Sequence, residues 1–105
     1  MPWVYLVVAG VFEIIWAVGL KYAQGFTRPA ASTVTIFAML VSFFFLAQAV
    51  KTIPVGTGYA IWTGIGAAGT AVFGIILFSE PASLARLFCI GLIVTGIIGL
   101  KLTST

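Results

Sequence analysis

The chain consists of four long apolar stretches separated by short polar breaks. The stretches cover about residues 2–20, 32–50, 57–78 and 84–102. A helix of about 20 residues rises roughly 30 Å, which matches the hydrocarbon thickness of a bilayer. Membrane β-strands are only about ten residues long and alternate apolar with polar residues, a pattern that these stretches lack. The sequence therefore predicts an all-α membrane protein, a single domain with four transmembrane helices per chain.

The composition points to lipid as the surroundings of the chain. Hydrophobic residues make up 62% of the sequence and charged residues 7%, and the mean hydropathy is +1.25. Since soluble domains carry about 25% charged residues, this chain cannot cover a water-facing surface. Its basic residues are scattered, unlike the basic patch of a nucleic-acid-binding protein. The chain has no His and one Cys, so we expect no metal site, no cofactor and no disulfide.

One of the two acidic residues, Glu13, lies inside the first apolar stretch. A charged group near the centre of a membrane helix costs roughly 2.5–3.5 kcal/mol on insertion scales. A carboxylate kept at this depth predicts a site that binds a cation or a proton. Positions three and four residues away share its helix face, and they hold Ala9, Gly10, Trp16 and Ala17. The small neighbours leave room for a ligand or for a close helix.

Other polar and aromatic residues in the stretches are candidates to line this site. Ser42 is the hydroxyl nearest the middle of the second stretch. If these groups gather around Glu13, hydroxyl, indole and carboxylate satisfy one another. A bond from Ser42 to its own i−4 carbonyl, and interfacial places for the aromatic residues, stay open as alternatives. The third stretch carries four candidates on one helix face: Tyr59, Trp62, Thr63 and Gly66.

Small residues mark two further features. The third stretch is rich in glycine, and Gly64 and Gly66 predict either a hinge or close helix packing. In the fourth stretch, Gly91, Thr95 and Gly99 recur every four residues and share one face. Such a stripe favours contact between helices, and we expect it to form a subunit interface.

The basic residues barely distinguish the two sides of the membrane. Four spans put Lys51 and Lys101 on one side and Lys21, Arg28 and Arg86 on the other. Orientation follows the excess of Lys and Arg in short loops, and here that excess is minimal. The chain can therefore insert both ways, which predicts an antiparallel dual-topology homodimer. That dimer has the inverted symmetry with which many transporters achieve alternating access.

Two segments carry more specific motifs. Residues 12–17 read Phe-Glu-Ile-Ile-Trp-Ala, and residues 59–67 read Tyr-Ala-Ile-Trp-Thr-Gly-Ile-Gly-Ala. They resemble the first and third helices of the small multidrug resistance family, and the similarity extends over essentially the whole chain. Trp16 stands where drug exporters of that family typically have Gly, so the chain is more similar to the guanidinium exporter subtype. Gly58 departs from the Ala that is common before the Tyr, which leaves the site assignment intact.

The resemblance implies an antiparallel homodimer in the bacterial inner membrane that exchanges guanidinium for protons. It implies that Glu13 of both subunits binds substrate and protons, while Ser42, Tyr59 and Trp62 position the carboxylates. By the same resemblance, Trp16 helps to wall the site. Guanidinium suits such a site chemically, because it pairs with a carboxylate through two parallel hydrogen bonds and is attracted to aromatic faces.

Other functions stay open at this stage, one of them within the same class of transporter. The first alternative is a proton-coupled exporter of quaternary ammonium or other hydrophobic cations, whose tails Met39 and Phe43 could admit from one face of the second stretch. A passive cation channel and a structural subunit of a membrane complex are further alternatives, although a scaffold has no need of a buried acid. An enzyme is not expected, because the chain has no His and no nucleophile–base pair.

Overall fold

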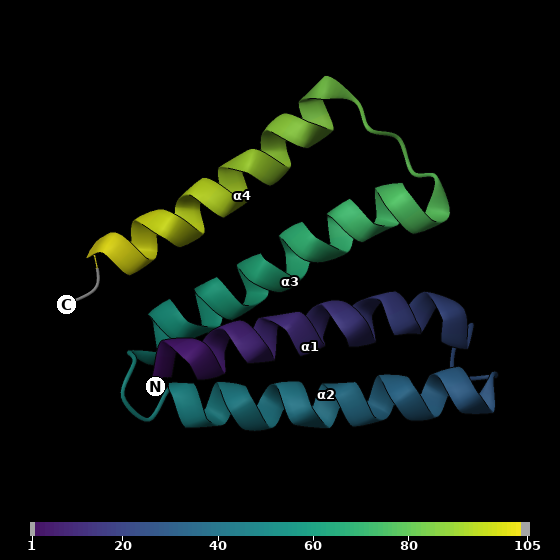
Figure 1. Ribbon diagram of the computed structural model, residues 1–105, viewed down its shortest axis with the longest axis horizontal. Coiled ribbons are helices and arrows are strands. Elements are labelled where there is room, and N and C mark those ends of the chain that lie inside the picture. Colours follow the sequence, from purple (N-terminus) through teal and green to yellow (C-terminus); the bar gives the residue numbers. More distant parts are fainter. Residues whose placement is uncertain (1, 104–105) are drawn as a thin grey trace.

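The computed structural model describes residues 2–103, which form four helices and no strand (Figure 1). Each helix is long and apolar enough to cross a membrane. The predicted all-α architecture with four membrane-spanning helices is thereby confirmed. The helices are α1 (Pro2–Ala23), α2 (Pro29–Ala49), α3 (Val55–Phe78) and α4 (Leu84–Thr103).

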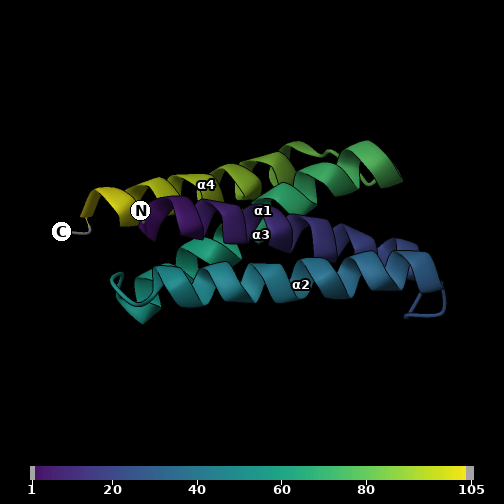
Figure 2. The same cartoon turned by 60° about the horizontal axis from the view of Figure 1, so that its bottom comes forward.

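The central helix of the bundle is α1. It packs against α2 on one side and α3 on the other, and α4 lies against the outer side of α3 (Figures 1 and 2). The start of α1, the α2–α3 turn and the end of α4 lie at one end of the bundle, and the other two connections lie at the opposite end. The smallest extent is 16 Å. The longest extent is 43 Å, so the bundle is flat.

Glycines let α1 and α3 approach closely. In each contact a larger side chain of one helix covers a glycine of the other, and a Cβ added to that glycine would overlap the side chain. Small residues at such positions are the usual basis of tight helix packing in membranes. The contacts are Glu13 over Gly66, Ile14 over Gly69, and Ile65 over Gly10.

The two glycines predicted as a hinge both lie inside one continuous helix, α3. A Cβ on Gly64 would lie 2.9 Å from the side chain of Ile97 on α4, and a Cβ on Gly66 would overlap Glu13. Both glycines therefore have a packing role, which was the alternative open from the sequence. Bending at these positions stays a prediction.

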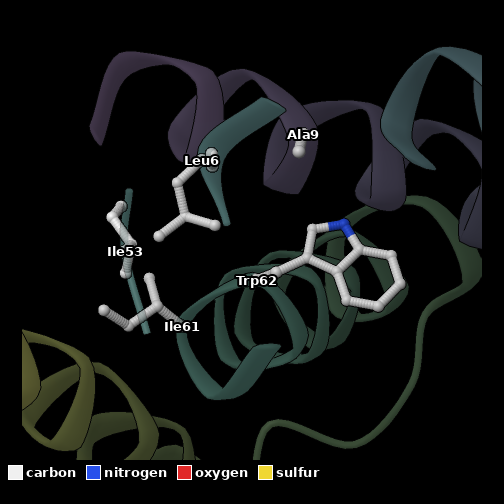
Figure 3. Packing of buried hydrophobic residues seen from close by; sticks show 6 residues of the cluster. Leu6, Ala9, Ile53, Ile61 and Trp62 are labelled. Carbon is white, nitrogen blue, oxygen red and sulfur yellow. The ribbon is translucent and has the colours of Figure 1, made fainter. Parts of the chain in front are cut away.

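The buried core occupies one half of the bundle, near the start of α1. Here Leu6 and Ala9 of α1 face Ile61 and Trp62 of α3, and Ile53 of the α2–α3 turn closes the end (Figure 3). Ala49 of α2 completes the cluster. Beside the other half of the α1–α3 interface lies a cavity, and Glu13 is part of its lining.

The outermost helix, α4, has no buried residue. It is tied to the bundle by packing on α3 and, at its end, by Lys101, whose Nζ lies 4.7 Å from the centre of the Trp3 ring. A Cβ added to Gly91 or Gly99 would meet no heavy atom within 4 Å, and Thr95 donates a hydrogen bond to the Gly91 carbonyl at 2.8 Å. Of the stripe predicted as a subunit interface, Gly91 and Thr95 are exposed, whereas Gly99 is half-buried and lines a groove between α3 and α4.

Candidate functional site

The carboxylate of Glu13 lies in the membrane-spanning part of α1 and rests against Gly66 of α3. Its Oε1 atom is buried and has no hydrogen-bond partner within residues 2–103. Burial of a polar atom without a partner is costly, and more so for a charged group. The unpaired carboxylate oxygen makes Glu13 the candidate binding residue of this part of the molecule.

Glu13 lines a cavity of about 480 Å³ between α1 and α3. This volume lies in the range of small-molecule sites, about 300–1,000 Å³. Most of the cavity wall consists of glycine, alanine and other apolar residues. The polar lining residues are Glu13, Thr63 and Thr70 along the helices and Lys21, Glu80 and Arg86 at the end nearest the α3–α4 linker.

Thr70 is a polar residue of this cavity that the sequence reasoning missed. Threonine in a membrane helix commonly bonds its own i−4 carbonyl, and Thr33, Thr35 and Thr95 do so at 2.8 Å. The Thr70 hydroxyl is buried without a partner in the described part of the chain. Thr70 follows Gly66 by four residues and shares its helix face, so helical periodicity could have identified it.

Charged residues surround the end of the cavity near the linker. The guanidinium of Arg86 forms an ion pair with Glu80, and the Nζ of Lys21 lies 5.4 Å from the centre of the Phe78 ring. The order of the spans predicts that Lys21 and Arg86 lie on the same side of the membrane. Their position in the same cavity as Glu13 depends on how α3 and α4 are connected, which no local pattern reveals.

Ser42 joins three helices through two hydrogen bonds. Its hydroxyl donates to the Ala9 carbonyl of α1 at 2.6 Å and accepts from the indole Nε1 of Trp62 of α3 at 2.9 Å. Figure 3 shows the indole nitrogen of Trp62 turned toward α1. In a helix the Ala9 carbonyl also accepts the N–H of Glu13, four residues on. Ser42 and Trp62 therefore fix the turn of α1 that carries Glu13, and Ser42 does not use its own i−4 carbonyl.

The remaining predicted aromatic residues form a cluster on the α2 side of this network. The ring of Phe43 lies 5.8 Å from that of Trp62 and 6.4 Å from that of Trp16, with edge-on geometry in both cases. Tyr59 lies 5.6 Å from Trp62 and is 58% exposed. Met39, one turn before Phe43, is half-buried. The Nε1 of Trp16 is buried without a partner within residues 2–103.

The predicted site residues thus fall into two groups. Thr63 and Gly66 share the cavity with Glu13, and Gly10 lies one turn away against Ile65. Across residues 2–103 no hydrogen bond joins Glu13 to the second group, because the Glu13 side chain faces α3 whereas Ser42 bonds α1 one turn earlier. The second group comprises Ala9, Trp16, Met39, Ser42, Phe43, Tyr59 and Trp62.

Comparison with known proteins identifies the family. The profile of the family described as Small Multidrug Resistance protein matches residues 1–93. This chain belongs to the small multidrug resistance family. As a small multidrug resistance protein with four apolar helices, it is a multi-pass integral membrane protein. The resemblance drawn from the two sequence motifs is confirmed.

Three relatives within this small multidrug resistance family carry the name "Guanidinium exporter". The proteins from Proteus vulgaris, Yersinia pseudotuberculosis serotype I (strain IP32953) and Citrobacter freundii are 61%, 59% and 58% identical to this chain over 104 residues. The matches cover 99% of this chain and at least 99% of each relative. The similarity therefore includes all the helices described above.

Proposed function

We propose that this protein exports guanidinium ion in exchange for protons, with Glu13 as the group that both ligands occupy in turn. The observation that carries the proposal is the buried Glu13 oxygen, which has no hydrogen-bond partner within residues 2–103 and faces a cavity of about 480 Å³. Full-length relatives named guanidinium exporters support the choice of cation. They come from bacteria, which supports the expected location in the inner membrane.

The chemistry of the ligand matches this site. Guanidinium is planar, delocalised and more weakly hydrated than an ammonium ion, so it enters an apolar cavity at lower cost. It can donate two parallel hydrogen bonds to a carboxylate. A proton neutralises the same carboxylate, so the two ligands compete. If the helices rearrange only when Glu13 is neutralised by one or the other, competition becomes exchange, and an inward proton gradient drives the cation out.

The transporting unit we propose is an antiparallel homodimer with two Glu13 carboxylates. The stripe of Gly91, Thr95 and Gly99 on α4, whose first two residues are exposed, offers an interface. The nearly balanced basic residues permit both orientations. In such a dimer, exchange of the conformations of the two subunits turns an inward-open state into an outward-open one. Bending of α3 at Gly64 and Gly66 would supply the movement.

The second group of residues receives a positioning role in this proposal. Ser42 and Trp62 hold the backbone of α1 near Glu13. Tyr59 and Trp16 extend the aromatic surface around Trp62, and we propose that they face the ligand in the assembled dimer. Aromatic faces attract a guanidinium ion through cation–π interactions.

A second candidate is proton-coupled export of quaternary ammonium or other hydrophobic cations. The observation in its favour is Phe43, which is 45% exposed and lies edge-on to both Trp16 and Trp62, with Met39 one turn before it. An apolar tail could leave the site sideways across this surface. Competition separates the candidates: a guanidinium exporter retains guanidinium uptake in the presence of a bulky aromatic cation, whereas a drug exporter transports the aromatic cation itself.

The deciding experiment is uptake of guanidinium into proteoliposomes under an imposed pH gradient, for the wild type and Glu13→Gln. We expect uptake that follows the proton gradient and disappears in the variant, because Gln can neither release a proton nor pair with a cation. Proton-driven uptake that persists in Glu13→Gln would refute the role of Glu13. Saturation-free flux without dependence on the gradient would indicate a passive channel instead.

A further inference from the structure

We infer that Glu80 is a second, outer binding site for guanidinium, at which the arriving ion replaces the guanidinium group of Arg86. This step deepens the proposed function and rests on it, because it describes how guanidinium reaches or leaves Glu13. Glu80 and Arg86 line the same cavity as Glu13, and Arg86 Nη2 donates a hydrogen bond to Glu80 Oε1. The cavity therefore has one acid inside the membrane-spanning part and one at its end.

The backbone around Glu80 turns its carboxylate toward the cavity. Ser79 ends α3 in the left-handed conformation, with φ of 55°, and the N–H of Glu80 then donates to the Gly74 carbonyl at 3.3 Å. The carboxylate lies directly on Gly74, where an added Cβ would overlap it. Glu80 is thus folded back along α3, and the glycine leaves the space that its carboxylate fills.

Arg86 is positioned separately, by the start of α4. The hydroxyl of Ser83 accepts a hydrogen bond from the N–H of Arg86 at 3.2 Å, which is the usual N-cap interaction. This cap sets Arg86 in the first turn of α4, from which its side chain reaches Glu80. Because the two residues are held by different backbone features, their ion pair can open while both helices stay in place.

The ion pair has the chemistry of a displaceable complex. Arg86 presents the same planar cation as the substrate, and its hydrogen bond to Glu80 uses a single carboxylate oxygen, Oε1. A free guanidinium can take both oxygens in parallel. The two side chains are 35% and 37% exposed. A pair exposed to this extent shifts an equilibrium by up to about fivefold, so a soluble ligand can replace it.

Arg86 neutralises Glu80 at this end of the cavity when no ligand is bound there. With the pair closed, Glu80 and Arg86 cancel, and Lys21 in the same lining leaves the entrance positive. A positive entrance disfavours every simple cation, so a cation binds here only if it can take the place of Arg86 on the Glu80 carboxylate, as a guanidinium ion can. When guanidinium binds Glu80, the Arg86 side chain is released to water. The Glu80 carboxylate then pairs with the free ion instead of with the arginine side chain. Glu80 is therefore occupied by a guanidinium group at every stage.

The direct test is NMR of the arginine side-chain nitrogens in Glu13→Gln protein in lipid nanodiscs. This variant lacks the inner carboxylate, so binding at Glu80 is observed alone and without transport. Guanidinium chloride is added against sodium chloride at equal ionic strength. The chain has two arginines, and exposed Arg28, in the loop at the same end of the bundle, is the internal reference.

We expect a saturable shift of the Arg86 signal with guanidinium, none for Arg28, and none for Arg86 in Glu13→Gln/Glu80→Gln. An Arg86 signal that does not move overturns the inference. So does a shift that sodium reproduces, or one that persists without the Glu80 carboxylate. The measurement does not depend on transport, so it decides the outer site even if the wild type fails to export guanidinium and the proposed function is lost.

A transport measurement gives the second readout. We expect Arg86→Gln to lower the apparent KM for guanidinium by up to about fivefold, because the tethered competitor is gone. Arg28→Gln removes the same charge at the same end of the bundle, outside the cavity, and is expected to leave KM unchanged. An unchanged KM in Arg86→Gln, or an equal decrease in Arg28→Gln, contradicts the inference, since a general effect of charge would explain the latter.

Discussion

At the scale of single residues, the absence of a side chain at Gly66 determines where the Glu13 carboxylate lies. A Cβ at this position would overlap the end of the Glu13 side chain, a flexible group that can turn away. We therefore expect Gly66→Ala to fold normally and to reduce guanidinium uptake by on the order of tenfold or more, because the acid is displaced. Gly56→Ala is the control, because Gly56 belongs to the same helix, α3, and a Cβ added to it would meet no heavy atom within 4 Å. Equal uptake by both variants would contradict the assigned position of Glu13.

The hydroxyl of Ser42 supports the same site from the other side of α1. Ser42→Ala removes the bonds to the Ala9 carbonyl and the Trp62 indole, both buried. Hydrogen bonds between membrane helices average about 0.6 kcal/mol and reach about 1.7, so we expect the free energy of unfolding to fall by about 1 kcal/mol in a denaturing-detergent titration followed by Trp fluorescence. Thr33→Ala is the control, because the exposed Thr33 hydroxyl bonds only the Pro29 carbonyl of its own helix. Equal losses would argue against an interhelical role of Ser42.

The residues of the site differed in how far the sequence could predict them. Glu13 stood out because a charge inside an apolar stretch is costly wherever the helices pack. Helical periodicity placed Trp62 on a shared face, but not its hydrogen bond to Ser42, which depends on the approach of two helices. The Glu80–Arg86 pair was missed because it forms across a linker, and nothing in a linker's composition gives the path of the backbone.

At the scale of the helices, lipid makes prediction straightforward in the middle of an element and difficult at its ends. The backbone in hydrocarbon must satisfy its own hydrogen bonds, so apolar stretches of this length are helical. The ends differ from the apolar pattern. α1 continues past Leu20 to Ala23, where Lys21 and Tyr22 contact the ring of Phe78. Long amphipathic side chains can extend a helix into the interface in this way.

The C-terminal end of α3 provides a prediction at this scale. Ser79 has φ of 55°, a left-handed conformation that glycine adopts without strain. Ser79→Gly is expected to raise the free energy of unfolding by about 0.5–1 kcal/mol, as judged by thermal or detergent denaturation. Ala82→Gly, in the same exposed linker but without a positive φ, is expected to lower it, because glycine adds freedom to the unfolded chain. Stabilisation by both substitutions, or by neither, would disprove this account of the helix end.

At the scale of the whole molecule, a single chain is too thin to enclose its own site. The smallest extent is 16 Å, α4 buries none of its residues, and the charged end of the Glu13 cavity is partly exposed. Within residues 2–103 no hydrogen bond joins the Glu13 carboxylate to the aromatic group around Trp62, which bonds Ser42 instead. A second copy in the opposite orientation would bring the corresponding groups of two chains into one chamber, which is why the proposed antiparallel dimer matters to the function.

The orientation of the chain in cells tests this arrangement. The α1–α2 loop and the α2–α3 turn lie at opposite ends of the bundle (Figure 1). The native cysteine is first replaced, by Cys89→Ala. The single-cysteine variants Thr27→Cys and Thr52→Cys then each carry one accessible thiol, at opposite ends of the bundle. Dual topology predicts that a membrane-impermeant thiol reagent labels about half of each variant from outside intact cells. Added lysines in the loop containing Thr27 are expected to bias insertion, so that one variant becomes fully labelled and the other protected. Full labelling of one position and none of the other before any charge is added would show a single orientation, and the antiparallel dimer would have to be abandoned.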